Sequence, residues 1–398
     1  MRKIAANYIF PITKEPIKNG IVVVDDNGAI TDIIDTKGEI KETENLEFYS
    51  GILVPGFVNS HCHLELSYLK NKIEKRKGLS SFVYQVRALR DDAEQNIITA
   101  LKKADNEMRA NGIVAVGDIS NCNISFQTKK QSKIIYHTFV EAFGFDENKA
   151  EEIFQKSELL YNEIVENYGL RASLVPHSPY SVSKNLFEKI SEFAQINKSI
   201  ISIHNQESEH ENSLFLNKTG ELYDRLRAIG IDFSNWKPTG ESSLKSTLPR
   251  LPKQNKTLLI HNTNTNQQDI DFAQNYFTEN KKLFWVLCPN SNLYIEDKLP
   301  DVELFTKNNL NIAIGTDSLS SNDSLSILDE LKTINKNFPN IEFKEAIKWA
   351  TINGAKALNF DSKLGSFDIG KTPGINLISN FDFKNMRLID ESEVSVLV

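Results

Sequence analysis

The chain has 398 residues, a length that suits two domains or one large α/β barrel with a smaller appendage. Hydrophobic residues make up 40% of the chain and charged residues 25%, which is ordinary for a soluble globular protein. The net charge of −7 and the lack of a basic block exclude a surface built for nucleic acid or an anionic membrane.

Further features of the sequence predict a cytoplasmic protein. No apolar stretch is long enough for a transmembrane helix, and the first residues lack the apolar core of a signal peptide. Cys62, Cys122 and Cys288 show no Cys-x-x-Cys spacing and cannot form a disulfide framework. We interpret the lysine-rich clusters near Lys75 and Lys129 as solvated helix faces.

Both ends of the chain have β character. Near the start, the apolar runs 21–25 and 29–34 flank an Asn-Gly pair, which is a strong hairpin signal. Near the end, the segments 370–379 and 393–398 are again typical of strands. We therefore expect residues 1–52 and 363–398 to meet in one small β-sandwich.

Short apolar runs alternate with helix-length segments over residues 53–362. The runs are 54–63, 113–118, 134–141, 170–177, 199–204, 257–261, 283–288 and 310–317. Apolar runs without a polar alternation are typical of parallel strands that are buried on both faces. Eight of them in βα order predict a closed (β/α)8 barrel of the TIM type. The alternative is a doubly wound open sheet, which usually has fewer strands and a glycine-rich phosphate loop, and no such loop sequence is present.

Polar residues fall at the carboxyl ends of these predicted strands, where barrel enzymes place their catalytic groups. Five of the seven histidines lie at such ends, and only His137 and His210 do not. The strand-end residues are His61, His63, His177, His204, His261 and Asp317. Scattered structural histidines would seldom be distributed in this way.

The strand-end histidines predict a metal site. His61 and His63 are two residues apart, so on an extended strand both side chains point the same way. We expect His61, His63, His204 and Asp317 to bind one divalent ion per chain. Neutral imidazoles with one carboxylate suit zinc, with iron(II) as the alternative. Such a site leaves a position for water, whose pKa the metal lowers toward neutrality.

Acid and base groups are predicted beside this site. Glu207 follows His204 by three residues and is placed to carry a proton to a ring nitrogen and then to a leaving group. The alternative for Glu207 is a solvated loop charge, because Glu209 and Glu211 follow it. Asp317 is placed to accept the proton of the water, and His261 to stabilise the developing oxyanion as a donor.

The motifs together resemble the mononuclear-metal branch of the amidohydrolase superfamily, the branch of deaminases and chlorohydrolases. They are Pro55-Gly-Phe-Val-Asn-Ser-His-Cys-His63, His177 after Val-Pro, His204-x-x-Glu207, His261 and Thr316-Asp317. The resemblance covers nearly the whole chain and implies the metal set and the acid/base roles given above. His177 stands where the binuclear branch has a lysine. One departure is Gly370-Lys-Thr-Pro-Gly-Ile-Asn376, where the family usually has Gly-Lys-x-Ala-Asp, and it touches only the terminal β module.

A narrower likeness concerns the 6-aminodeoxyfutalosine deaminases, enzymes that remove an adenine amino group. It is carried by His63-Leu-Glu65, His177-Ser-Pro-Tyr-Ser-Val182, Ser202-Ile-His-Asn-Gln-Glu-Ser208, Cys288-Pro-Asn-Ser-Asn292 and Thr316-Asp-Ser-Leu-Ser-Ser-Asn322. The resemblance implies that His177 contacts the sugar or the ring of the substrate. It suggests further contacts from Glu65, Ser320 and Asn322. A homodimer is a family-level expectation.

Three functions remain open at this point. The first is hydrolytic deamination of an aminated purine or adenine-nucleoside-type substrate, with 6-aminodeoxyfutalosine as one candidate. The second is hydrolysis of another C–N bond or of a C–Cl bond of a heterocycle by the same groups, because specificity lies in the loops. The third is a non-catalytic barrel that serves as a binding or scaffold protein. Loss of Glu207 or of a metal ligand would favour the third, and all of them are present.

Overall fold

A computed structural model describes residues 1–41, 44–90, 92–277 and 279–398. Its centre is a barrel of short strands, and the predicted strand-end residues are buried, apart from His177, which is half-buried. The barrel strands are β6 (Phe57–Cys62), β7 (Ile113–Ser120), β8 (Ile135–Ala142), β9 (Arg171–Pro176), β10 (Ile201–Asn205), β11 (Thr257–His261), β12 (Leu283–Leu287) and β13 (Ile312–Ile314). Strands β6 to β9 form one parallel ladder of four, and β10 to β13 form another.

The two ladders close into one barrel at two joints. At the first, between β9 and β10, the backbone N–H of His204 donates to the carbonyl of His177 at 3.0 Å. At the second, between β13 and β6, the backbone N–H groups of Thr316 and Asp317 donate to the carbonyl of His61 at 3.0 and 3.1 Å. Cys62 and Asp317 form an isolated parallel bridge at the same place. The predicted (β/α)8 barrel is therefore confirmed, and predicted site residues make the bonds that close it.

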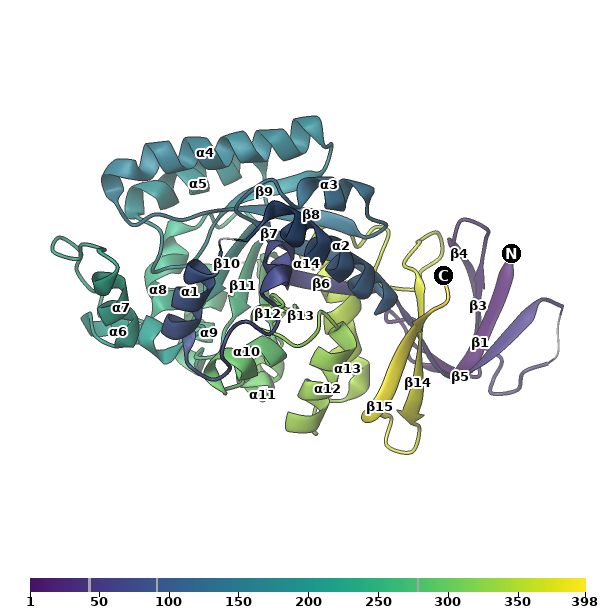
Figure 1. Cartoon of the computed structure of the whole chain (residues 1–398). Coiled ribbons are helices and arrows are strands. Elements are labelled where there is room, and N and C mark those ends of the chain that lie inside the picture. The colour runs from purple at the N-terminus through teal and green to yellow at the C-terminus, as the bar shows by residue number, and fades with distance from the viewer. Residues whose placement is uncertain (42–43, 91, 278) are drawn as a thin grey trace.

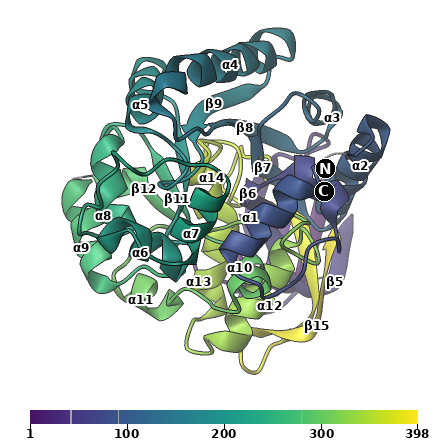
Figure 2. The same cartoon turned by 60° about the vertical axis from the view of Figure 1, so that its left-hand side comes forward.

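Helices surround the barrel (Figures 1 and 2). Their bounds are α1 (Leu79–Ala88), α2 (Glu94–Ala110), α3 (Phe126–Gln131), α4 (Ala150–Asn162), α5 (Lys184–Asn197), α6 (Glu209–Asn217), α7 (Glu221–Ala228), α8 (Ser243–Thr247), α9 (Gln267–Tyr276), α10 (Pro289–Glu296), α11 (Val302–Lys307), α12 (Ile327–Asn337), α13 (Phe343–Lys348) and α14 (Gly354–Ala357). In α5 the Ser183 side chain caps the first turn by accepting from the N–H of Leu186, and Leu186, Ile190 and Ala194 repeat every four residues on its buried face.

Both chain ends join one β-sheet beside the barrel, seen on the right of Figure 1 with the N and C termini. Its strands are β1 (Arg2–Ile9), β2 (Ile17–Lys18), β3 (Ile21–Val24), β4 (Ile30–Ile34), β5 (Leu46–Pro55), β14 (Ile375–Asp382) and β15 (Arg387–Val396). Strand β5 pairs with β1 on one side and with β14 on the other, so all seven strands are hydrogen-bonded into one sheet. The prediction that both termini build one β unit is confirmed.

Lys129 corrects the interpretation of the lysine clusters. Its side chain is fully buried, and Nζ lies 2.6 Å from Oδ2 of Asp118, which is also fully buried. The ammonium group donates further hydrogen bonds to Ser120 and Thr138. Lys75 does lie on an exposed surface, where it pairs with Asp323. None of the described helices is long and apolar enough to cross a membrane.

Candidate active site

Local structure brings His61 and His63 together. His61 is the fifth residue of the fully buried strand β6, and His63 precedes a 3₁₀ helix, η1 (Leu64–Leu69). Gly315 lies at the end of β13, and a Cβ on it would stand 2.8 Å from Cβ of His61. A glycine is therefore required for the end of β13 to pass the His61 side chain at this distance.

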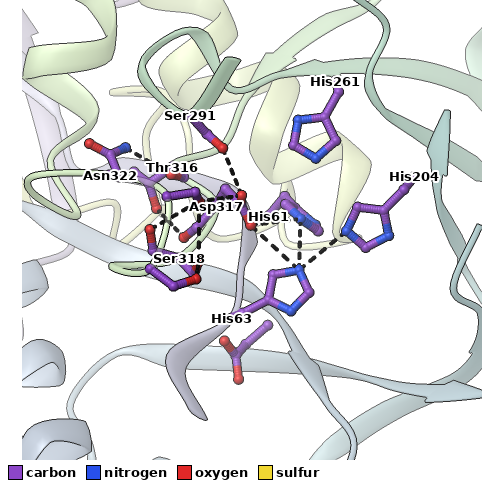
Figure 3. Close-up of polar contacts among 12 residues, drawn as sticks. His61, His63, His204, His261, Ser291, Thr316, Asp317, Ser318 and Asn322 are labelled. Atoms are coloured by element: carbon purple, nitrogen blue, oxygen red, sulfur yellow. Dashed lines mark hydrogen bonds and ion pairs between the residues drawn. The ribbon is translucent and has the colours of Figure 1, made fainter. Parts of the chain in front are cut away.

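Three imidazole nitrogens converge on one point (Figure 3). Nε2 of His63 lies 3.2 Å from Nε2 of His61 and 3.3 Å from Nε2 of His204. Oδ1 of Asp317 lies 3.6 Å from Nε2 of His61 and 3.5 Å from Nε2 of His63. The structure thus brings together all four predicted metal ligands, which come from the ends of β6, β10 and β13.

These spacings fit a metal ion. Zn–N bonds of about 2.0–2.1 Å in a tetrahedron place neighbouring ligand atoms about 3.3–3.4 Å apart. The histidine nitrogens have this separation, and the carboxylate oxygen is slightly farther away. Nδ1 of His204 donates to the carbonyl of His177 at 2.8 Å, so its Nε2 carries the lone pair that faces the other rings. A cation satisfies such a cluster of lone pairs, whereas without one they repel each other.

The remaining atoms of the site are held by hydrogen bonds. Oδ2 of Asp317 accepts from the hydroxyl groups of Ser291 and Ser321 at 2.7 and 2.5 Å, which leaves Oδ1 directed at the histidines. Nδ2 of Asn292 lies 3.4 Å from Nδ1 of His261 and can only donate to it. The ring proton of His261 is therefore on Nε2, which is 3.6 Å from Oε1 of Glu207.

The backbone is strained where these side chains leave the strands. Gln206, His261 and Asp317 have positive φ angles of 47°, 74° and 55°, a region that residues other than glycine rarely occupy. Each lies at the end of a barrel strand or just beyond it, next to or within the candidate site. Strain of this kind concentrates where a fold must aim functional side chains.

Burial and neighbouring charges move the pKa values of the two carboxyl groups in opposite directions. For Glu207, burial raises the pKa well above its usual value, and the negative charges of Asp317 and Glu211 add to this effect. For Asp317, burial alone would raise the pKa, but the hydrogen bond from His61 and the nearby His63 hold it well below its usual value. Burial therefore favours the protonated form of Glu207, whereas the neighbouring histidines favour the ionised form of Asp317.

A cavity of about 530 Å³ leads to the site. Its polar floor includes His63, His204, Glu207, His261 and Asp317. Its walls are largely apolar and come from α1 (Leu79, Phe82, Val83, Val86), from α7 (Leu226), and from Phe143, Phe145, Ile229 and Ile231. Figure 2 shows α1 and α7 near each other in front of the barrel, over this opening.

The predicted substrate contacts lie at different depths. His177 lines the cavity. Glu65, Ser320 and Asn322 are buried but are not among the residues that line it. Ser320 hydrogen-bonds to Ser318, and Asn322 donates to Glu330 and to the carbonyl of Thr316. The role of these three residues in substrate binding stays a prediction.

Comparison with known proteins places the chain in a family. Residues 52–391 match the model of the amidohydrolase family. This chain is a member of the amidohydrolase family. The resemblance drawn from its motifs is thereby confirmed.

Relatives of this amidohydrolase cover most of its length. It is 29% identical to an adenosine deaminase of Helicobacter pylori over 78% of this chain and 75% of that protein. It is 30% identical to an aminodeoxyfutalosine deaminase of Nitratiruptor sp. over 83% of this chain and 79% of that protein. Among solved structures, it resembles H. pylori aminofutalosine deaminase in complex with methylthio-coformycin, with a TM-score of 0.79, 25% identity, and coverage of 97% and 94% of the two chains. It shares its fold with a zinc-bound adenosine deaminase of Xanthomonas campestris, with a TM-score of 0.74, 20% identity, and coverage of 95% and 84%.

Two residues of the amidohydrolase cavity were missed in the sequence. Glu141 and Asn121 both line it, and they hydrogen-bond to each other. Glu141 lies near the end of β8, so the strand-end rule applied to all polar residues, and not mainly to histidines, would have found it. Asn121 directly follows β7 and carries the same signal.

Proposed function

We propose that this amidohydrolase is a metal-dependent hydrolytic deaminase of an aminated purine nucleoside, with zinc as its ion. The observation that carries the proposal is the placement of two buried carboxyl groups, Glu207 and Asp317, beside a cluster of three histidine nitrogens, with their pKa values moved in opposite directions. Hydrolytic deamination needs one group that gives a proton and another that takes one. The zinc in a structural relative and the spacing of the nitrogens support the choice of metal.

In this proposal His61, His63, His204 and Asp317 hold one divalent ion. Such an ion lowers the pKa of water toward neutrality and so supplies a nucleophile at pH 7. Oδ1 of Asp317 takes a proton from the attacking water, because its low pKa keeps it ionised. Glu207 gives its proton to a ring nitrogen of the substrate and takes up the proton of the added hydroxyl as the carbonyl forms. The proton that Asp317 took from the water leaves with the ammonia, so both carboxyl groups return to their starting state. His261 directs its Nε2–H at the oxygen that gains negative charge.

The shape of the cavity and the relatives support a purine nucleoside. The walls are apolar enough to cover a purine ring, and the polar floor carries the acid and base groups. The relatives compared above are named as deaminases of adenosine and aminodeoxyfutalosine. We place 6-aminodeoxyfutalosine among the candidate substrates, with His177 on the cavity wall contacting the sugar or the ring.

The proposal also covers the cellular location and the partners of the enzyme. A cytoplasmic location agrees with three free cysteines, Cys62, Cys122 and Cys288. The predicted homodimer and the absence of nucleic-acid and membrane partners stay predictions.

Ammonia release from metal-loaded protein tests the function. Adenosine, 5′-deoxyadenosine, 6-aminodeoxyfutalosine and adenine are incubated with it, and a chlorinated heterocycle is included to detect chloride release. We expect ammonia from at least one nucleoside. Chloride release without ammonia would establish the alternative hydrolase instead.

The substitution Glu207→Gln tests the role of the proton donor. It removes the proton donor without changing the size of the side chain, so kcat should fall about 10²–10⁴-fold, the range expected for a general acid–base group. One divalent ion per chain should remain, as measured by elemental analysis. Glu209→Gln is the matched control, because Glu209 is exposed two residues away on α6, and it should keep its activity. Unchanged kcat in Glu207→Gln would show that Glu207 is not the proton donor.

A further inference from the structure

We propose that Glu141 is a binding group for the sugar of the nucleoside, with Oε1 of its carboxyl group accepting hydrogen bonds from the sugar hydroxyls. The inference rests on the proposed function, because it assigns the sugar of that nucleoside to a residue in the wall of the same cavity.

The carboxyl group of Glu141 has one satisfied oxygen and one free oxygen. Its side chain is only 3% exposed, yet it lines the cavity. Oε2 accepts a hydrogen bond from Nδ2 of Asn121 at 2.9 Å. Oε1 is buried and has no hydrogen-bond partner in the part of the chain that the structure describes. A buried carboxyl oxygen without a donor is unfavourable, so a donor on a bound ligand would stabilise it.

Asn121 fixes the direction of this carboxyl group. Its backbone N–H donates to Oε2 of Glu65 at 3.0 Å, and its Oδ1 accepts from Nη2 of Arg90 at 2.9 Å. Nη2 of Arg90 also lies 3.6 Å from Oε1 of Glu65. Because Oδ1 of Asn121 accepts a hydrogen bond from Arg90, the amide is oriented with its Nδ2 toward Glu141. Glu65 and Arg90 are therefore positioning residues in this arrangement, and Glu141 presents the free oxygen.

A second metal ion explains the free oxygen of Glu141 less well than a hydrogen-bond donor does. One ligand atom each of Glu141, His177 and His204 lie within 4.8 Å of one another, which is close enough for a metal site. The His204 nitrogen that faces Oε1 is Nδ1 at 3.6 Å, and it is protonated because it donates to the carbonyl of His177. Nδ1 of His177 is engaged by the hydroxyls of Ser178 and Ser181. A neutral hydrogen-bond donor suits Glu141 better than an ion does.

The position of Glu141 indicates which part of the substrate supplies that donor. The metal-site nitrogens meet at the Nε2 edge of His204, whereas Glu141 lies at its Nδ1 edge. Glu207 lies beside His261, with its Oε1 3.6 Å from Nε2 of that ring. A purine whose amino-bearing ring meets Glu207 and the histidine cluster presents another part of the molecule to Glu141. In a nucleoside the hydroxyl groups on that other part belong to the sugar.

The test compares adenosine with 2′,3′-dideoxyadenosine, which lacks the two ring hydroxyls of the sugar. The kcat/KM of both is measured for metal-loaded wild type, Glu141→Gln and Glu152→Gln, and the metal content of each is recorded. Wild type should prefer adenosine. Glu141→Gln should reduce kcat/KM for adenosine by about tenfold or more, mainly by raising KM. It should change kcat/KM for the dideoxy substrate by less than about twofold. Glu152→Gln, a surface control on α4, should match wild type for both substrates.

The outcomes separate this inference from the proposed function. If wild type deaminates adenosine but Glu141→Gln keeps the wild-type preference, Glu141 does not bind the sugar. If Glu141→Gln loses metal and kcat/KM falls equally for both substrates, Glu141 positions the metal ligand His204 instead, and the inference is wrong. If wild type acts on another nucleoside of the ammonia-release experiment but not on adenosine, the same variants are compared on that nucleoside and its form without the sugar hydroxyls. If wild type releases ammonia from none of those nucleosides, the proposed function fails and this inference fails with it.

Discussion

Among single residues, Lys129 should contribute strongly to the free energy of unfolding. Its ion pair with Asp118 is fully buried, and Oδ1 of Asp118 accepts from the backbone N–H of Leu64, next to His63. Lys129→Met leaves the Asp118 carboxylate buried and unpaired, so the free energy of unfolding should fall by about 3–5 kcal/mol. Urea unfolding measures this. Lys130→Met, on an exposed position of the same helix, should change little. Equal stability of the two variants would contradict the prediction.

Glu330 should make the stability of the protein depend on pH. Burial raises its pKa to about 8, while its two oxygens accept from Asn322 and from the backbone N–H of Asn290. The folded state therefore holds the proton more tightly than the unfolded state does. The stability that this provides is fully present below the unfolded pKa and is lost as pH rises toward 8.

The difference in unfolding free energy between wild type and Glu330→Gln isolates this effect. It should fall between pH 5 and 8 by at most about 1.4 kcal/mol per pH unit, and become level above that range. Because the variant carries the same metal site, the pH dependence of metal binding cancels in the difference. Urea midpoints at one-unit pH steps measure it. A difference that is constant with pH would show that Glu330 titrates at its ordinary pKa.

Single residues of the site could be predicted where the rule applied that functional side chains lie at the carboxyl ends of barrel strands. Imidazoles are few in this chain, so five at strand ends formed a clear pattern for the metal site. Glu141 is one of many acidic residues, and only its place near a strand end distinguishes it from a surface charge. Lys129 looked solvated because its helix, α3, is too short to show a periodic apolar face. Burial of such residues is decided by contacts between distant strands, which the local sequence does not contain.

At the scale of elements, the strands were more predictable than the connections between them. The mainly apolar runs of β7 and β12 have few alternatives, and both strands lie where they were expected. The connection after β10 contains α6, α7 and α8, whose short polar sequences give weak helical signals. The cavity wall contributed by α7 therefore could not be foreseen, although the strands that aim the site residues could.

Helix α1 should open locally more often than helix α5. Only Leu79 and Ser80 are buried among its ten residues, whereas α5 buries five residues of fourteen. Apolar residues of α1 such as Phe82 and Val86 face the cavity instead. Few buried contacts mean that local opening costs little free energy, so amides of α1 should exchange with solvent faster than those of α5.

Bound nucleoside should slow exchange in α1 and leave α5 unchanged, because the ligand covers the apolar face of α1. Hydrogen–deuterium exchange with mass spectrometry measures this on the Glu207→Gln protein, which should hold adenosine without consuming it. Equal protection of α1 with and without adenosine would mean that the substrate does not reach this wall.

At the scale of the whole molecule, the candidate metal site spans the two halves of the barrel. His61 and His63 come from the β6–β9 ladder, and His204 and Asp317 come from the β10–β13 ladder. The backbone bonds that close the barrel involve His61, His177, His204 and Asp317 as well. An ion held by His61, His63, His204 and Asp317 therefore ties together the same two ladders that the hydrogen bonds join.

Removal of the ion should for this reason destabilise the whole barrel. An ion at about 100 times its dissociation constant stabilises the folded state by about 2.7 kcal/mol, so a chelator should lower Tm by roughly 3 °C. Calorimetry before and after chelation, followed by zinc addition, measures the loss and its recovery. His204→Asn removes one ligand and should make Tm insensitive to the chelator. If chelation empties the wild-type site without lowering Tm, the ion does not hold the two ladders together.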